Sequence, residues 1–264
     1  MSADAKDVII VVTDSRGRSL QSFGNQVKYD HFYSVTKYFP GYDMRRIATE
    51  VKALLPAYST RNYYCVILAG ICSLTEKIYE NHQQSIRYPL DRRHQKIEDV
   101  TNIIHDLKNS FGKRINISTI VPASLGKYFQ HHNPNERHPP ELEAEQDALL
   151  EDIERLNQVI RELNFNFGTT TINLSNRFLT HSKKKQRRTN SGASRRVTKF
   201  KDQHLSDGVH FSEEIKSVCF TLIYSTAELD LSQLSQDNIR CEDSSQDSQD
   251  SETEWDFKRK VLLK

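Results

Sequence analysis

The chain has 264 residues, of which 36% are hydrophobic and 27% charged, with a formal net charge of +2 at pH 7. A globular core is therefore possible, while the overall polarity is typical of a domain that carries solvated segments. The first apolar run, residues 8–12, is too short for a signal peptide, and no stretch approaches the ~20 apolar residues of a membrane span, so we expect an intracellular protein of the cytoplasm or nucleus.

Segments with strand character alternate with segments of helical spacing along the first 226 residues. The predicted strands are residues 8–13, 33–39, 63–68, 115–121 and 169–174, and the predicted helices include residues 45–55, 92–111, 141–163 and 212–226. Strict alternation predicts an α/β fold: a three-layer, flavodoxin-like sandwich with a five-stranded parallel sheet and helices on both faces. In such sheets the active groups gather at the carboxyl ends of the strands.

The first predicted strand ends on Asp14-Ser15. A serine at the end of a buried strand, where the chain turns into a helix, holds its hydroxyl at a fixed place, which suits a nucleophile. Asp and Ser are also favoured helix N-caps, so the pair could simply begin the next helix. The stretch alone leaves both interpretations open.

Near the end of the sequence, Asp207 precedes His210 by three residues, immediately before the last predicted helix. At this spacing a carboxylate can hold an imidazole in one tautomer, and a serine nucleophile needs such a base because its hydroxyl is otherwise weak. An ordinary turn followed by a helix start is the alternative interpretation of the same residues.

Four short blocks together resemble the SGNH/GDSL hydrolase superfamily over roughly residues 7–227. The first is Thr-Asp-Ser-Arg-Gly around Ser15, and the last is Asp-Gly-Val-His from Asp207 to His210. Between them, "FPGYDMRRI" is similar to the second block and aligns its glycine with Gly41, and the segment after the third strand aligns Cys72 with the asparagine of the third block. Each block falls at a predicted strand end.

The resemblance implies serine-dependent hydrolysis of a small ester or acyl substrate, without a cofactor. The implied roles are Ser15 as nucleophile, His210 as base and Asp207 as its partner, with an oxyanion hole formed by Ser15, Gly41 and the side chain at Cys72. A thiol is a poor hydrogen-bond donor, so this hole is weakened. A catalytically inactive module that binds nucleic acid or a protein partner therefore remains the alternative function. A structural cysteine is favoured over a nucleophile for Cys72.

A basic segment interrupts the domain between the fifth predicted strand and Asp207. Residues 183–201 hold nine lysines or arginines and no acid. This charge is typical of a nuclear localisation signal or of a non-specific, salt-sensitive nucleic-acid contact, and also of a solvated insertion, here residues 181–203. The candidate nucleic-acid contacts are Lys183, Lys184, Lys185, Arg187, Arg188, Arg195 and Arg196.

The remaining features indicate no metal site. The four cysteines lie far apart without a C-x-x-C pair, and His131, His132 and His138 match no standard ligand spacing, so their Pro- and Asn-rich surroundings predict a loop. By the resemblance, this loop would lie beside the active site.

Residues 228–256 hold ten acids and one arginine, a composition that predicts a disordered tail. The expected division is a domain of residues 1–227 and a tail of residues 228–264.

Overall fold

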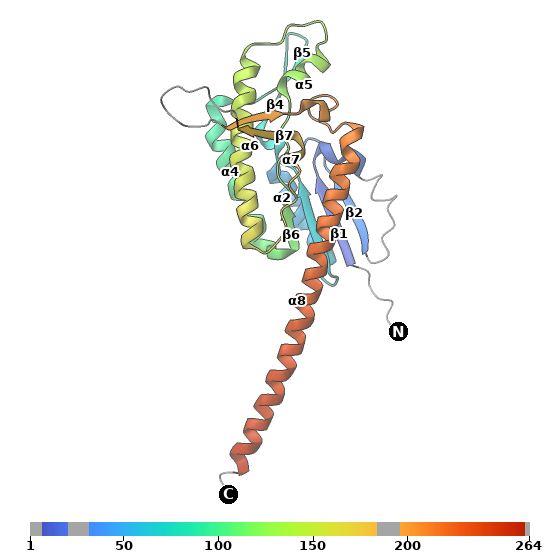
Figure 1. Cartoon of the computed structure of the whole chain (residues 1–264), viewed down its shortest axis with the longest axis vertical. Coiled ribbons are helices and arrows are strands. Elements are labelled where there is room, and N and C mark those ends of the chain that lie inside the picture. Colours follow the sequence, from blue (N-terminus) through green and yellow to red (C-terminus); the bar gives the residue numbers. More distant parts are fainter. Residues whose placement is uncertain (1–6, 21–31, 184–195, 262–264) are drawn as a thin grey trace.

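The computed structural model describes residues 7–20, 32–183 and 196–261, and it places helices on both faces of one parallel sheet (Figure 1). Within these residues the sheet has four strands in the order β2-β1-β3-β6. Their bounds are β1 Asp7–Thr13, β2 Phe32–Tyr38, β3 Tyr63–Leu68 and β6 Ile115–Ile117. The predicted three-layer α/β sandwich is confirmed, but the sheet has four strands rather than five.

The alternating faces of β1 explain the layers. Ile9 and Val11 pack on one face against residues of α8, while Val8, Ile10 and Val12 pack on the other against α2, α4 and α6. All five side chains are fully buried. A strand covered on both faces has a continuous run of apolar residues, and this run is why β1 could be predicted from the sequence.

The helices and the smaller strands complete the fold. The helices are α2 Met44–Leu54, α3 Ile71–Leu74, α4 Arg93–Phe111, α5 Leu125–His132, α6 Glu141–Asn166, α7 Ser175–Phe178 and α8 Glu213–Val261. Short 3-10 helices are η1 Ser15–Ser19, η2 Leu55–Tyr58, η3 Leu90–Arg92, η4 Gly112–Arg114 and η5 Asp202–His204. Two antiparallel hairpins pair β4 Glu76–Glu80 with β5 Gln83–Arg87, and β7 Leu179–Lys183 with β8 Arg196–Phe200.

The predicted fifth strand, residues 169–174, was wrong. This segment runs beside the end of β6, but side chains satisfy much of its backbone: Asn116 Nδ2 donates to the Thr170 carbonyl at 2.7 Å, and the Asp230 carboxylate accepts from the Thr170 amide at 3.0 Å. One backbone bond, from the Thr119 amide to the Ile172 carbonyl, joins it to the segment after β6. Because side chains take the place of a ladder, the segment is extended without being a strand.

The fourth strand is also shorter than the predicted residues 115–121. Beyond Ile117 the buried side chain of Asn157 bonds both backbone groups of Ile120, accepting from its amide at 2.6 Å and donating to its carbonyl at 3.0 Å. The Asn157 side chain of α6 thus satisfies backbone groups that a neighbouring strand would otherwise bond, and the β ladder ends early.

The last helix continues well beyond the predicted end at residue 226. Asp230 and Leu231 of α8 are buried against the sheet, on the far side of the expected boundary at residue 227. Beyond the sheet, α8 extends away as one long helix (Figure 1). In the described ranges, none of the helices combines the length and apolar character needed to cross a bilayer.

The basic segment is described only at its two ends. There β7 and β8 pair in register, with Lys183 opposite Arg196, so the ends of the expected insertion of residues 181–203 are strands of a hairpin. The other candidate nucleic-acid contacts lie outside the described residues: Lys184, Lys185, Arg187, Arg188 and Arg195.

Candidate active site

A cavity of about 580 Å³ lies at the carboxyl edge of the sheet, where the turns after β1, β2 and β3 meet the segment before α8. Ser15, Gly41, Cys72, Asp207 and His210 all line it. The sequence-predicted site residues, drawn from four segments nearly two hundred residues apart at the extremes, therefore face one space.

Ser15 is held at the start of η1 by a tight turn. Asp14, the N-cap, accepts from the Arg16 amide at 3.0 Å through its side chain, and its carbonyl accepts from the Gly17 amide at 3.1 Å. A Cβ on Gly17 would collide with the Thr13 side chain, so glycine is required there. The two interpretations of this stretch are compatible, because Asp14 caps the helix while Ser15, half-buried, faces the cavity.

Asp207 and His210 form a hydrogen-bonded pair. The Asp207 carboxylate lies 2.7 Å from His210 Nδ1, and its other oxygen accepts from the amides of Val209 and His210 at 2.9 and 2.8 Å. Burial raises the pKa of Asp207, but these hydrogen bonds from His210 and Val209 outweigh it and leave the pKa well below its ordinary value. An ionised Asp207 favours the tautomer that carries the proton on Nδ1, with Nε2 as the free acceptor.

Gly208 fixes this pair against α5. Its φ of +92° is a conformation that side chains disfavour, and an added Cβ would lie 2.5 Å from the Tyr128 backbone nitrogen and 2.6 Å from the Ser124 carbonyl oxygen. The Gly208 carbonyl in turn accepts from the Ser124 amide at 2.8 Å. The Asp207-His210 turn is thus docked on the backbone of another element, in a way that only glycine permits.

Three groups could face an oxyanion in this cavity. Gly41, at φ +75°, presents backbone to the cavity, as does Ser15 at the first position of η1, where a helix leaves its amides without an intrahelical acceptor. Cys72 supplies a thiol whose pKa burial raises to about 12. It is therefore protonated at neutral pH, which disfavours Cys72 as a nucleophile. The neighbouring Ser73 hydroxyl is already bonded, accepting from the Met44 amide at 2.7 Å.

Two buried charged side chains, Asp14 and Arg16, flank Ser15, and their burial was not predicted from the sequence. Arg16 donates to the Val121 carbonyl and, at 3.0 Å, to the Pro122 carbonyl, so it ties the turn after β1 to the segment after β6. Burial raises the pKa of Asp14 and lowers that of Arg16, and each charge opposes this shift in the other. Asp14 Oδ2 and Arg16 Nε have no hydrogen-bond partner among the described residues. The available signal was a pair of charged residues flanking the serine.

Another wall of the cavity was also not predicted from the sequence. It consists of Lys77, Gln84 and Ile86 from the β4-β5 hairpin together with Tyr128 and His132 from α5. The rings of Tyr128 and His132 lie in contact, with centroids 4.4 Å apart. His132 lies beside the site as the resemblance led us to expect, although it ends a helix rather than lying in a loop.

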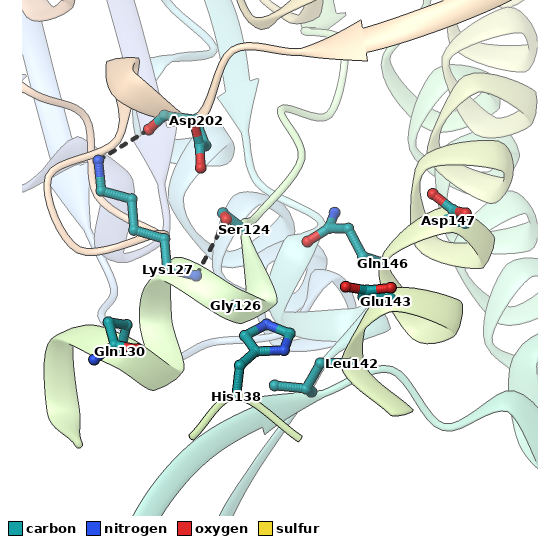
Figure 2. A pocket seen from close by; sticks show the side chains of 10 residues that line it. All are labelled: Ser124, Gly126, Lys127, Gln130, His138, Leu142, Glu143, Gln146, Asp147 and Asp202. Atoms are coloured by element: carbon teal, nitrogen blue, oxygen red, sulfur yellow. Dashed lines mark hydrogen bonds between the residues drawn. The ribbon is translucent and has the colours of Figure 1, made fainter. Parts of the chain in front are cut away.

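A second cavity, of about 610 Å³, lies between α5, α6 and Asp202 and is shown in Figure 2. Ser124 and Lys127 line it, the Lys127 amide donating to Ser124 Oγ at 3.3 Å and Lys127 Nζ to the Asp202 carbonyl at 3.2 Å (Figure 2). His138 also lines this cavity, whereas none of the predicted triad and oxyanion residues lines it. The described residues that line this cavity include no nucleophile with a paired base, so the first cavity is the candidate active site.

No family model matches the sequence, and no curated protein matches it. Among solved structures, the chain is similar to a GDSL-like lipase from Bacteroides thetaiotaomicron, with a TM-score of 0.51 at 11% identity over 86% of this chain and 88% of that one. A lipase/acylhydrolase from Enterococcus faecalis matches with a TM-score of 0.49 at 16% identity over 85% and 95% of the two chains. At these identities the first likeness concerns the fold alone. The sandwich therefore has the fold of this GDSL-like lipase, which is the fold that the four sequence blocks indicated.

Proposed function

We propose that this protein is a serine-dependent hydrolase of small ester or acyl substrates. The observation that carries the proposal is the 2.7 Å bond between Asp207 and His210 Nδ1 in a cavity that Ser15 also lines. A serine, a histidine and a carboxylate that orients the histidine are the parts that nucleophilic acyl transfer requires.

The residues have separate tasks. Ser15 Oγ attacks the substrate carbonyl while His210 Nε2 takes its proton, and the same imidazole then protonates the leaving alcohol. A water molecule, activated by His210, next cleaves the acyl-enzyme and frees Ser15. Asp207 keeps the imidazole oriented and stabilises its charged form in both halves of the reaction.

The oxyanion is stabilised mainly by backbone. The amides of Ser15 and Gly41 would donate to it, while the Cys72 thiol contributes little. Losing one such donor typically lowers turnover by about 100- to 1000-fold. We therefore expect a slow hydrolase, and the inactive module is the competing account.

The direct test is hydrolysis of short 4-nitrophenyl esters by the full chain and by Ser15→Ala. We expect a rate above the uncatalysed background that the substitution removes. Ser59→Ala is the matched control, because Ser59 is exposed at the end of η2, away from the cavity, and its rate should equal that of the unsubstituted protein. Equal rates for the protein and Ser15→Ala would contradict the proposal and favour the inactive module.

A further inference from the structure

Lys77 places a positive charge on the wall of the candidate active site. It lies in β4 opposite Ile86 of β5, and both line the cavity together with Gln84, which is two residues before Ile86 in β5. Alternate residues of a strand share a face, so Lys77, Gln84 and Ile86 belong to the face of the hairpin turned toward Ser15 and His210.

Two carboxylates beside this hairpin, Glu145 and Glu76, are bonded to other groups. Glu145 pairs with Arg87 and accepts from the Tyr88 amide at 2.9 Å. Glu76 takes Arg92 at 2.9 Å and Lys96 at 3.1 Å.

Two further carboxylates, one in α6 and one in the cavity, are also paired. Asp152 takes Arg93 at 2.9 Å, and Asp207 takes His210 at 2.7 Å. Among the described residues, the Lys77 side chain forms no ion pair or hydrogen bond, and Asp207 is the only acid among the residues that line the cavity. Within the described part of the chain, the ammonium group is therefore not bonded to any carboxylate.

Lys77, an exposed residue that lines the cavity, lies close enough to two other lining residues to affect their pKa values. Burial lowers the pKa of His132, and the charges of His131 and Lys77 lower it further. Burial also raises the pKa of Cys72, which Lys77 partly opposes. Lys77 thus acts on residues of two other walls, α5 and the turn after β3.

The hairpin is fixed to the rest of the domain, so the charge is held in place. The Gln84 amide donates to Asn133 Oδ1 at 3.1 Å, Asn133 Nδ2 donates to the Gln84 carbonyl at 2.7 Å, and Gln84 Nε2 donates to the Tyr128 hydroxyl. The Ile86 side chain of the same hairpin is buried. A fixed wall holds the base of the lysine side chain in one place and reduces what must be ordered when a ligand binds.

We propose that Lys77 binds an anionic group of the substrate, so that the preferred substrates are esters carrying a carboxylate at the end of a short acyl chain opposite the scissile bond. This inference rests on the proposed function. The apolar side chains Ile71, Ile86 and Val209 would contact the methylene groups between the two ends. Water cleaves the ester as in any acyl transfer and the carboxylate is unchanged, so Lys77 determines specificity and is not part of the chemical step.

The test compares two substrates of similar shape, mono-4-nitrophenyl glutarate and 4-nitrophenyl pentanoate, at equal ionic strength. The unsubstituted protein should have the higher kcat/KM for the glutarate. In Lys77→Met the ratio of the two kcat/KM values should fall about tenfold, through KM rather than kcat, which is the low end for losing a hydrogen bond between charged groups. Lys77→Arg should retain most of the preference.

Lys37→Met is the matched control. Lys37 is an exposed lysine of β2 that does not line the cavity, and the substitution removes the same charge. Its substrate ratio should equal that of the unsubstituted protein. A ratio unchanged in Lys77→Met, equally changed in Lys37→Met, or favouring the neutral ester in the unsubstituted protein would overturn the inference while leaving the proposed function in place.

Failure of the proposed function is seen separately. If neither ester is hydrolysed in a Ser15-dependent way, calorimetric titration of Ser15→Ala with glutarate still tests the subsite. Saturable binding that Lys77→Met removes and Lys37→Met keeps would support an anion site in a non-catalytic pocket. No binding would overturn the inference together with the function.

Discussion

Buried charged side chains occur at both ends of the sheet, and the two groups differ in how completely they are hydrogen-bonded. At the amino end, Lys108 Nζ donates to the Ile115 carbonyl at 2.7 Å and to Thr169 Oγ1 at 2.9 Å, while Asp230 accepts from the Thr170 amide and the Tyr64 hydroxyl. At the carboxyl end, the buried side chains of Asp14 and Arg16 leave one oxygen and one nitrogen without a hydrogen-bond partner among the described residues.

The difference separates stability from chemistry. At the amino end, Lys108 and Asp230 join β6, α4 and α8. Their hydrogen bonds compensate much of the free-energy cost of burying the two charges. The carboxyl-end group lies directly behind Ser15 and beside an open cavity, where an incompletely satisfied charge is typical of a functional site. Substitutions at the two ends should therefore affect different measurements.

The largest expected effect is at the carboxyl end. Asp207→Asn keeps the shape of the turn but removes the charge that selects the His210 tautomer, so turnover of a 4-nitrophenyl ester should fall about 10,000-fold. The free energy of unfolding, measured in urea, should change far less in proportion. A variant that retains turnover would show that Asp207 has only a structural role.

A substitution at the amino end should have the opposite signature. Asp230→Ala leaves Lys108 buried with less opposing charge and removes the acceptor of Tyr64 and Thr170, so we expect a loss of about 3 kcal/mol in the free energy of unfolding. Turnover under native conditions should remain unchanged. Glu228→Ala, on the same helix, is the control and should leave both quantities unchanged. Lost turnover in a folded Asp230→Ala protein would break the comparison.

The oxyanion hole offers a gain of function. Cys72→Asn would replace a poor donor with a good one, and turnover should rise by about 100-fold, the low end of what one such donor contributes. The measurement is kcat on a 4-nitrophenyl ester. Cys65→Ser is not a suitable control, because Cys65 is fully buried and its substitution would destabilise the core. Cys241→Ser, beyond the sheet on α8, is the suitable control. No gain would mean that residue 72 does not face the oxyanion.

A further prediction concerns pH. Burial lowers the pKa of Lys108 from 10.5 to about 7, which Asp230 partly opposes. Below pH 7 the folded and unfolded states both hold this proton, and between pH 7 and 10.5 only the unfolded state does. The free energy of unfolding should thus gain up to about 1.4 kcal/mol per pH unit in that window from this group. In Lys108→Met, urea unfolding at several pH values should no longer show this dependence of the free energy of unfolding on pH. An unchanged dependence would mean that another group causes it.

The sequence predicted the elements whose residues face a single kind of environment. β1 and β3 are buried on both faces, and their apolar runs placed them within one residue. The site blocks were recognisable because each needs particular residue types at a strand end: Asp14 to cap, Gly208 to turn, and His210 three residues after Asp207.

What the sequence could not predict depends on long-range side-chain contacts. Asn157 ends β6 early and Asp230 keeps residues 169–174 out of the sheet, and neither contact leaves a local pattern. The β4-β5 hairpin, and with it Lys77, had a faint signal at Asn81-His82, whose positive φ angles of 49° and 64° form its turn without the usual glycine.

The most direct test of the account is reaction of the intact protein with a fluorophosphonate probe, followed by mapping of the modified residue by peptide mass spectrometry. We predict a covalent adduct on Ser15 that forms at least 100-fold more slowly in His210→Ala, because the imidazole must accept the proton of the hydroxyl. An unmodified Ser15, or labelling at the same rate without the imidazole, would contradict the claim that these two side chains act together.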